Sequence, residues 1–245
     1  MLLNGAERRA RLADARLLLV LTPDMAADDP LPRLADAWEH VDIVQVRPKA
    51  RGDRRAAAPA RSTVTEARAC YDLCERLLDE LAGVPRHARP LVMVNDRVDV
   101  AAALADRGVD GVHVGADDAP AGVARETLGD DLLLGLSTHS ASDVAAAWDE
   151  PVDLLGFGPV FATSTKGYGD ADAARDAPRV GGPESAWIAS ETAPVPLFPI
   201  GGIDLSNADQ LARVGRAAVG SAIVGAAVPG DAARALRGLL FEGDG

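Results

Sequence analysis

The chain has few aromatic residues, only two cysteines and fewer basic than acidic residues, and each shortage excludes a class of protein. Its 245 residues include 25 Lys and Arg against 37 Asp and Glu, a net charge of -12. Such a chain repels polyanions, which argues against a nucleic-acid-binding surface or an anionic-membrane surface. No apolar run reaches transmembrane length, and residues 1–16 carry charges where a signal peptide needs an apolar core. We expect a soluble, cytoplasmic protein.

The two cysteines, Cys70 and Cys74, stand four residues apart in a run with helical spacing. This spacing predicts reduced, half-buried thiols rather than a disulfide framework. No third or fourth soft ligand stands near them in the sequence, so we expect no metal site there. The hydrophobic content of 48% and the mean hydropathy of +0.03 are sufficient for a buried core.

Eight short apolar runs recur along the chain, and they predict β-strands. Most are nearly continuous in Val, Leu and Ile, which is typical of strands buried on both faces of a parallel sheet. The predicted strands are 17–22, 41–47, 90–95, 108–114, 132–136, 152–157, 195–200 and, more weakly, 217–223. Stretches with helical spacing lie between them at 64–81, 98–107, 141–148, 206–214 and 231–240.

This alternation favours a single (β/α)8 TIM barrel of the α/β class, residues 1–245, over an open doubly wound sheet. Two segments interrupt the alternation, 50–62 and 167–183, and both are rich in Gly, Pro, Ala and charged residues. We predict that they are mobile loops over an active site, because barrel enzymes place lids after strand ends. Ordinary solvent-exposed insertions are an equal alternative.

In a barrel, the residues that follow each strand converge on one face. The second predicted strand ends in Gln45, Arg47 and Lys49, which alternate and therefore leave the strand on the same side. Two cations beside an amide suit a diphosphate, since Arg47 can bind two oxygens and Lys49 acts as a point charge. A solvated strand end is the alternative, but Gln45 lies within an apolar strand.

Hard oxygen ligands follow the next two strands. Asn95 and Asp96 end the third strand, and Asp117 and Asp118 follow the fourth. Carboxylates on adjacent strand ends, close to a diphosphate, suit Mg2+, which keeps several of its waters. Alone, the Asn95-Asp96 pair could instead cap a helix. His113 is a single histidine among carboxylates, so we expect it to pack or to hydrogen-bond rather than to bind metal.

Hydroxyl groups follow the fifth and sixth strands. Ser137 stands two residues before His139, but no G-x-S-x-G turn is present, so we do not expect a hydrolase nucleophile. Ser137 either donates a hydrogen bond to a substrate or caps a helix. After the sixth strand, Thr163, Thr165 and Lys166 follow a glycine-bearing turn, a composition that favours anions.

Glycines mark the exits of the last two strands. Gly201 and Gly202 follow the seventh strand, and Gly220 precedes Ser221 at the eighth. Backbone N–H groups at these positions form the usual monophosphate site of a barrel, although glycines also serve tight turns. The sequence thus predicts a Mg2+-linked diphosphate site and a monophosphate site on one face. No poised nucleophile is evident, which favours a transfer that expels pyrophosphate over a hydrolysis.

Seven motifs in this order resemble the thiamine-phosphate synthase family, whose superfamily also includes thiazole tautomerases. They are VQVRPK, VNDRVDVA, GVHVGADD, GLSTHS, GFGPVFATSTK, PIGGI and GSAI. The resemblance implies a transferase of thiamine biosynthesis that joins 4-amino-5-hydroxymethyl-2-methylpyrimidine diphosphate to 4-methyl-5-(2-phosphoethyl)thiazole. The products would be thiamine phosphate and pyrophosphate. In this family the pyrimidine is thought to ionise as pyrophosphate leaves, before the thiazole nitrogen attacks.

By matching position, the resemblance implies a role for each site residue. Gln45 would hold the pyrimidine, and Ser137 matches the family serine near the reaction centre. The residues matched to the diphosphate are Arg47, Lys49, Asn95 and Lys166, and those matched to Mg2+ are Asp96 and Asp118. The residues matched to the region of the thiazole phosphate are Thr163, Thr165, Gly202, Ser221 and Ile223. The expected catalytic groups are Arg47, Ser137 and Lys166.

Some features leave alternatives open. Ala116 stands where the family usually has Gln, and Asp117 beside Asp118 leaves the metal ligand open, although register with His113 favours Asp118. A thiazole tautomerase would not need the diphosphate and metal residues that this chain retains. A non-catalytic barrel that binds a phosphorylated metabolite and regulates a partner is a further alternative. We expect small phosphorylated substrates as partners, no nucleic acid and no membrane, and leave a homo-oligomer open.

Overall fold

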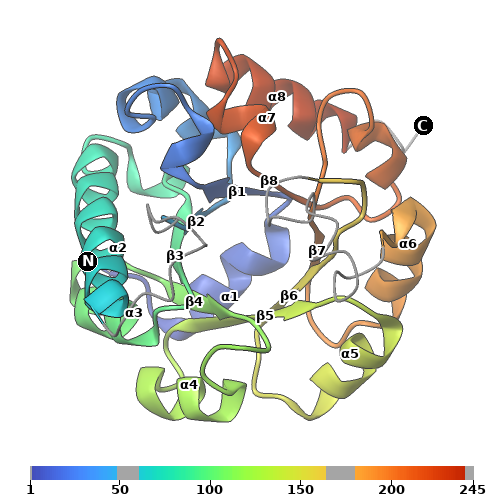
Figure 1. Cartoon of the computed structure of the whole chain (residues 1–245), viewed down its shortest axis with the longest axis horizontal. Coiled ribbons are helices and arrows are strands. Elements are labelled where there is room, and N and C mark those ends of the chain that lie inside the picture. Colours follow the sequence, from blue (N-terminus) through green and yellow to red (C-terminus); the bar gives the residue numbers. More distant parts are fainter. Residues whose placement is uncertain (1, 49–60, 164–179, 241–245) are drawn as a thin grey trace.

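The computed structural model describes residues 2–48, 61–163 and 180–240, with 61–65 described by their backbone alone. Eight parallel strands form one sheet in the order β7-β6-β5-β4-β3-β2-β1-β8. A parallel bridge between Ile200 and Ala218 joins the two edges, so the sheet closes (Figure 1). The strands are β1 Leu17–Leu21, β2 Ile43–Val46, β3 Leu91–Asn95, β4 Gly111–Val114, β5 Leu133–Thr138, β6 Leu154–Phe157, β7 Leu197–Pro199 and β8 Ala217–Val219. The prediction of a (β/α)8 TIM barrel is confirmed.

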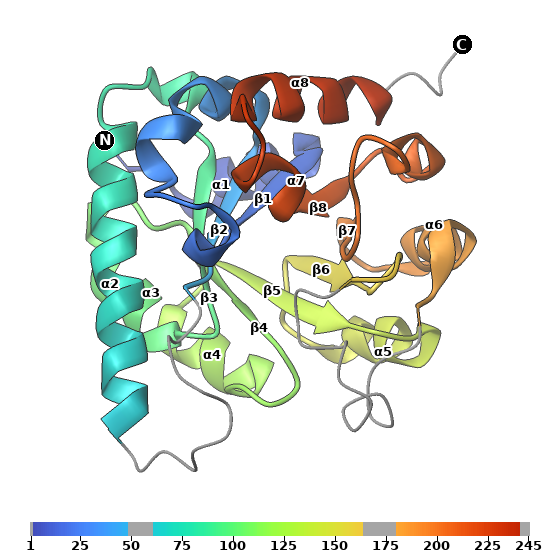
Figure 2. The same cartoon turned by 45° about the horizontal axis from the view of Figure 1, so that its top comes forward.

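Helices lie between the strands and surround the barrel (Figure 2). The described α-helices are α1 Gly5–Asp14, α2 Arg61–Leu81, α3 Val98–Leu104, α4 Ala121–Leu128, α5 Ala141–Ala146, α6 Gly182–Thr192, α7 Ser221–Val224 and α8 Pro229–Leu239. The described 3-10 helices are η1 Pro23–Met25, η2 Leu31–His40, η3 Arg86–Ala88, η4 Ala105–Arg107, η5 Ala147–Asp149 and η7 Ala208–Leu211. Within the described ranges, no helix combines the length and the apolarity needed to cross a membrane.

All eight predicted strands are present, but the structure corrects several element boundaries. The run 217–223 divides into β8 and the short helix α7, because the strand ends where Gly220 interrupts it. The predicted helix at 206–214 contains only a four-residue 3-10 turn, η7. Helix α1 has no counterpart among the predicted helices.

The predicted loop boundaries also change. Arg61 and Ser62 already lie in α2, and Gly182 and Pro183 begin α6. Proline suits the first turn of a helix because its missing N–H has no intrahelical partner there. Val180 and Gly181 are described and precede α6, whereas residues 50–60 and 167–179 of the two predicted loops lie outside the described residues.

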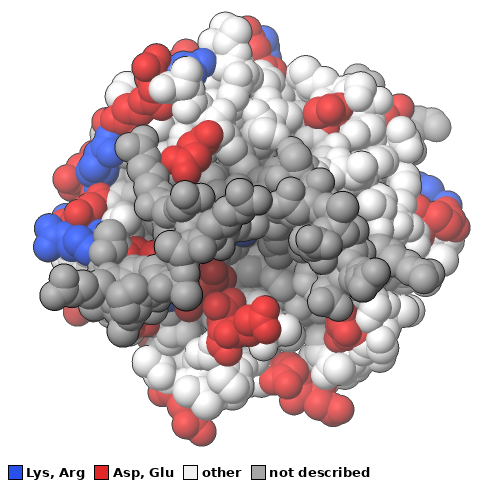
Figure 3. Space-filling model, viewed as in Figure 1, with Lys and Arg blue, Asp and Glu red and all other residues white. Residues whose placement is uncertain are grey.

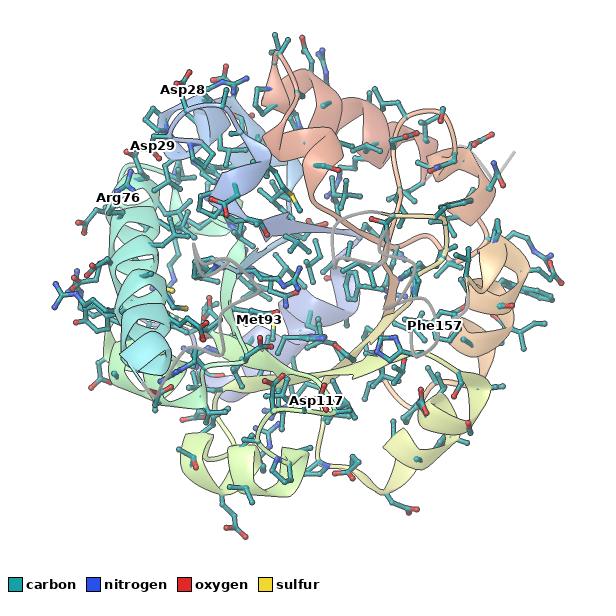
Figure 4. All side chains as sticks on the ribbon, in the orientation of Figure 1. Asp28, Asp29, Arg76, Met93, Asp117 and Phe157 are labelled. Atoms are coloured by element: carbon teal, nitrogen blue, oxygen red, sulfur yellow. The ribbon has the colours of Figure 1, made fainter. Side chains whose placement is uncertain are left out.

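Alternate residues of each strand face the interior of the barrel. Ile43 and Met93 belong to a buried interior cluster, and Met93 is labelled at the centre of Figure 4. Intervening strand residues pack outward against the helices in a second, larger cluster. Because side chains alternate along a strand, Gln45 and Asn95, each two residues farther on, also point inward, at the C-terminal end of the barrel.

Cys70 and Cys74 lie in the outer core between α2 and the sheet. Their exposed fractions are 1% and 0%, so they are fully buried rather than half-buried as predicted. Both are free thiols, and the pKa of Cys74 is raised by a hydrogen bond with Cys70 and by burial. The thiolate is therefore disfavoured, which makes Cys74 a packing residue rather than a nucleophile.

Aspartates stand just before three alternate strands at the N-terminal end of the barrel: Asp42 before β2, Asp110 before β4 and Asp153 before β6. Each accepts a hydrogen bond from a backbone N–H at the start of the preceding strand. Each also pairs with arginine. One carboxylate thus satisfies a backbone donor and a guanidinium at each position.

Helix α1 covers this end of the barrel and is visible through its centre in Figure 1. Leu12 of α1 packs into the interior cluster. Arg8 Nε donates to Asp110 Oδ1 at 2.9 Å, and the two residues are 4% and 6% exposed. Burial raises the pKa of Asp110, while hydrogen bonds from Val92 and Arg8 oppose the rise. The helix therefore closes the N-terminal end of the barrel, here called its floor, and a buried ion pair holds it there.

Candidate active site

A cavity lies at the C-terminal end of the barrel and has two chemically different walls. One wall is apolar, with residues of β1, β6, β7 and β8 such as Val20, Leu154 and Phe198. The other carries polar side chains from β2 to β5, which include Gln45 and Ser137. On the face seen in Figure 3, described acidic atoms lie near the middle and described basic atoms lie mainly at the edges. Such a cavity suits a flat, largely apolar ring that carries a phosphorylated group.

Most of the described candidate residues meet at this cavity. Those that line it are Gln45, Arg47, Asn95, Ser137, Thr163, Gly202 and Ser221. These residues come from the exits of β2, β3, β5, β6, β7 and β8, so distant segments converge as the strand ends predicted. Three further candidates, Lys49, Thr165 and Lys166, lie outside the described residues.

Gln45 and Asn95 form the centre of the polar wall. Gln45 Nε2 donates to Asn95 Oδ1 at 2.6 Å, and Gln45 is 6% exposed. This bond fixes how both amides present their remaining groups to the cavity. Arg47 follows on the same side of the chain, and its backbone N–H donates to Leu21 O at 2.9 Å. The backbone is held against β1, and Arg47 lines the cavity.

The two predicted metal ligands lie on turns at the exits of β3 and β4. Asp96 has a φ of 63°, and its backbone N–H donates to His113 O at 2.8 Å. Aspartate tolerates this left-handed conformation better than most residues. Asp118 Oδ2 accepts from Gly115 N at 2.8 Å, whereas Asp117 is exposed, near the exit of β4 in Figure 4. Neither Asp96 nor Asp118 is among the cavity-lining residues.

This donor set fits Mg2+ only in part. β3 and β4 are paired with Asn95 opposite His113, so the two turns leave neighbouring strands. In the part of the chain that the structure describes, no three His, Cys, Asp or Glu side chains gather as a metal site. Asp96 and Asp118 would therefore need further oxygen ligands from substrate phosphate and water. That is the usual arrangement for Mg2+ on phosphorylated substrates.

A second carboxylate near Asp96 belongs to an ion pair instead. Asp99, in the first turn of α3, accepts from Arg97 Nε at 2.9 Å. The hydrogen bond from Arg97 holds the pKa of Asp99 below its usual range. Asp99 is therefore ionised at neutral pH but is already engaged by Arg97.

Hydrogen bonds order the exit of β5, where sequence reasoning identified only Ser137. His113 Nε2 lies 3.0 Å from Ser137 Oγ, and both residues line the cavity. Thr138 Oγ1 donates to Gly156 O at 2.9 Å. His139 Nδ1 lies 2.5 Å from Gly158 O. These contacts join the ends of β4, β5 and β6 into one framework.

Sequence reasoning did not assign Met25, Thr138 or His139 to the site, although all three line the cavity. Thr138 and His139 directly follow Ser137 at a strand exit, and that position was the available signal. Met25 is apolar and lies in η1, shortly after the end of β1. Only this closeness to a strand end could have indicated that it lines the cavity.

The glycine turn after β7 packs directly on the loop after β6. Gly201 and Gly202 have φ values of 103° and 65°. A Cβ at Gly202 would lie 2.5 Å from Ala162 O, so a side chain would not fit. Glycine is required here both for the backbone conformation and for the close approach. This contact brings the segment that contains Thr163 next to Gly202.

At the exit of β8 the two candidate residues behave differently. Ser221 is exposed, begins α7 and lines the cavity. Ile223 is 0% exposed and packs in the outer core. The structure therefore does not bring the Ile223 side chain to the cavity, because in the short helix α7 it packs into the outer core instead.

Comparisons with known proteins show which family this chain is similar to. A family model described as thiamine monophosphate synthase matches residues 17–223. The chain is 37% identical over 210 residues to a thiamine-phosphate synthase of Acidothermus cellulolyticus, covering 84% of this chain and 85% of that protein. It is 38% identical over 235 residues to a thiamine-phosphate synthase of Synechococcus sp. (strain CC9605), covering 95% of this chain but 57% of that protein. The chain thus spans little more than half the length of this cyanobacterial relative.

Solved structures show the same architecture. Thiamine phosphate pyrophosphorylase from Pyrococcus furiosus superposes with a TM-score of 0.71 at 28% identity, covering 97% of this chain and 99% of that one. A 3-hexulose-6-phosphate synthase from Salmonella typhimurium superposes with a TM-score of 0.58 at 16% identity, covering 93% and 99%. The second match is a likeness of fold alone.

Proposed function

The chain belongs to the thiamine monophosphate synthase family, and we therefore propose that it joins an aminopyrimidine methyl diphosphate to a thiazole phosphate, releasing pyrophosphate. One observation supports this most strongly. Gln45, Arg47, Asn95 and Ser137 line the same cavity as Gly202 and Ser221. The residues predicted to bind a diphosphate and those predicted to bind a monophosphate thus line one cavity, as a transfer between two phosphorylated substrates would require.

The proposed reaction needs no enzyme nucleophile. The bond between the pyrimidine methylene carbon and the diphosphate oxygen breaks, and its electron pair leaves with pyrophosphate. The lone pair of the thiazole nitrogen then forms the new carbon–nitrogen bond. Arg47 and Asn95 would bind the diphosphate and stabilise the charge that grows on it, and electrostatic stabilisation of this kind usually contributes most to the rate. Gln45 would orient the pyrimidine ring.

Asp96 and Asp118 are the residues that would hold Mg2+. When bound, Mg2+ supplies positive charge to the departing pyrophosphate. Lysine usage also supports a cationic diphosphate site. Of the 25 basic residues in the chain, two are lysines, Lys49 and Lys166, and both belong to the proposed set. Arginine serves the other basic positions, so both ammonium side chains of the chain belong to residues predicted to bind the leaving group.

The test is an assay of the purified chain with both substrates, with and without Mg2+. We expect thiamine phosphate and pyrophosphate in equal amounts, only with Mg2+. Asp96→Asn and Lys166→Ala should each lower the rate by at least about tenfold. Asp99→Asn is the matched control, because this carboxylate is near Asp96 but paired with Arg97. Unchanged activity in both test variants would overturn the proposed site, and turnover of a thiazole tautomer without coupling would indicate a tautomerase.

The cytoplasmic location stays a prediction. The sequence left a homo-oligomer open, and it stays open here. Small phosphorylated substrates as partners follow from the proposed reaction.

A further inference from the structure

The imidazole of His113 lies against the inner wall of the barrel, over two glycines in the neighbouring strands β5 and β6. His113 belongs to β4 and is 7% exposed. A Cβ at Gly135 of β5 would lie 2.3 Å from His113 Nδ1. A Cβ at Gly156 of β6 would lie 3.2 Å from Cε1 and 3.3 Å from Nε2. The ring therefore occupies the space that side chains of β5 and β6 would otherwise fill.

The ring makes a polar contact at the point where it meets the cavity. Its Nε2 lies 3.0 Å from Ser137 Oγ. The backbone of the same residue also reaches the acidic turn, because His113 O accepts from Asp96 N at 2.8 Å. One residue thus touches both the hydroxyl and the carboxylate turn that the proposed function uses.

A simple packing role does not account for this geometry. An apolar residue in β4 could fill the same space without a buried polar ring, and two glycines would not be needed for a smaller side chain. A buried ring nitrogen is costly unless it is hydrogen-bonded. The nitrogen nearest the cavity lies within hydrogen-bond distance of a hydroxyl that lines it. Both observations favour a role directed at Ser137.

We propose that His113 is the positioning residue of Ser137: packed over Gly135 and Gly156, it holds the serine hydroxyl in one rotamer for the proposed transfer that releases pyrophosphate. This inference rests on the proposed function. A serine hydroxyl otherwise samples several staggered rotamers, and ordering it during the reaction would cost free energy. A hydroxyl fixed in advance acts mainly in the transition state, so its loss lowers kcat more than it raises KM.

Two substitutions at position 113 separate positioning from packing. In His113→Gln the side-chain amide can reach the place of Nε2, whereas in His113→Asn it reaches only the place of Nδ1. We expect kcat to fall about tenfold in His113→Asn, with KM for both substrates within about twofold, since a hydrogen bond of this kind is worth about one order of magnitude. His113→Gln should recover kcat to within about threefold of the wild type. Equal losses in both variants would overturn the proposal.

A double-mutant cycle tests whether the effect passes through Ser137. In a Ser137→Ala background, His113→Asn should lower kcat by less than about twofold, because the hydroxyl that it positions is already gone. Independent, multiplying losses would contradict the proposal. Gly156→Ala provides a variant with His113 intact: its Cβ must displace the ring by a few tenths of an ångström, and kcat should fall several-fold. Gly122→Ala is the control, since outside its own helix backbone no atom lies within 4 Å of the added Cβ.

A measurement independent of turnover keeps this inference separate from the proposed function. The chain has four histidines, so the side-chain nitrogen resonances of 15N-histidine-labelled protein can be assigned with the position-113 variants. Ser137→Ala should shift the Nε2 resonance of His113 and leave the other three histidines nearly unchanged. An unmoved resonance in an active enzyme would overturn the inference alone. If Ser137→Ala shifts the resonance but the wild type forms no thiamine phosphate, the proposed function is overturned while the contact is supported.

Discussion

The two ends of the barrel both carry aspartates, but they use them differently. At the N-terminal end, Asp42, Asp110 and Asp153 each bind an arginine and a backbone N–H, in repeated positions before alternate strands. At the C-terminal end, Asp96 and Asp118 lie on turns that follow the strands, beside a cavity of mixed polarity. The first set stabilises the fold, and the second is the pair proposed to bind Mg2+. Stability and activity should therefore respond to different substitutions.

The largest effect should come from the floor of the barrel. Asp110→Ala removes the counter-ion of Arg8 and the acceptor of Val92 N–H in a buried place. We expect the free energy of unfolding to fall by about 3–5 kcal/mol, because an unpaired buried guanidinium remains. Urea unfolding measures this. Replacing Arg8 and Asp110 together by Met and Leu should restore much of the loss, and a double variant as unstable as the single one would contradict the ion-pair explanation.

At the opposite end, Arg47→Ala should affect catalysis rather than stability. We expect kcat of the proposed thiamine phosphate formation to fall about 100-fold, because the guanidinium proposed to stabilise the leaving group is lost. The backbone N–H of Arg47 still bonds to Leu21 O, so the melting temperature should stay within a few degrees. Steady-state kinetics and thermal melts check both parts. A large loss of stability would show that the two ends are not separate in function.

A more exposed ion pair at the N-terminal end should contribute less to stability than the pair of Arg8 and Asp110. Arg9 Nε bonds to Asp153 Oδ1 at 2.7 Å, but the arginine side chain is 42% exposed. Asp153 keeps Arg125 and the N–H of Leu134 when Arg9 is removed. Arg9→Ala should therefore cost less than about 1 kcal/mol in urea unfolding. A cost equal to that of Asp110→Ala would mean that burial does not set the strength of these pairs.

The smallest effect should appear as a pH dependence at the C-terminal end. The pKa of Asp99 is lowered by Arg97, so its contribution to stability is present above the ordinary value of 3.8 and is lost as pH falls through the lowered folded pKa. The stability difference between wild type and Asp99→Asn should thus be at most about 0.5 kcal/mol at neutral pH, since the pair is exposed. Unfolding curves at several pH values should show that it vanishes in acid.

Much of the cavity could be predicted because it depends on local patterns. Apolar runs identified the strands, and alternation along β2 placed Gln45 and Arg47 on one side of the chain. Parallel pairing then brought the strand exits together. Both walls follow from which residues stand at inward positions, and that is readable in the sequence once the barrel is assumed.

The floor could not be predicted, because its contacts join distant parts of the chain. Arg8 and Asp110 are 102 residues apart, and the charged segment that contains α1 has no apolar run that reveals its partner. The packing of the His113 ring could not be predicted either. Its contacts with Gly135 and Gly156 depend on the register of β4, β5 and β6, which single-strand patterns do not give.

The aspartates before β2, β4 and β6 have an evolutionary consequence. They precede three of the four even-numbered strands, so three similar ion pairs, rather than one, stabilise this end of the barrel. When one of these aspartates is exchanged, the ion pairs of the other two remain in place. The opposite rim would then be free to accumulate changes in substrate preference while the scaffold persists.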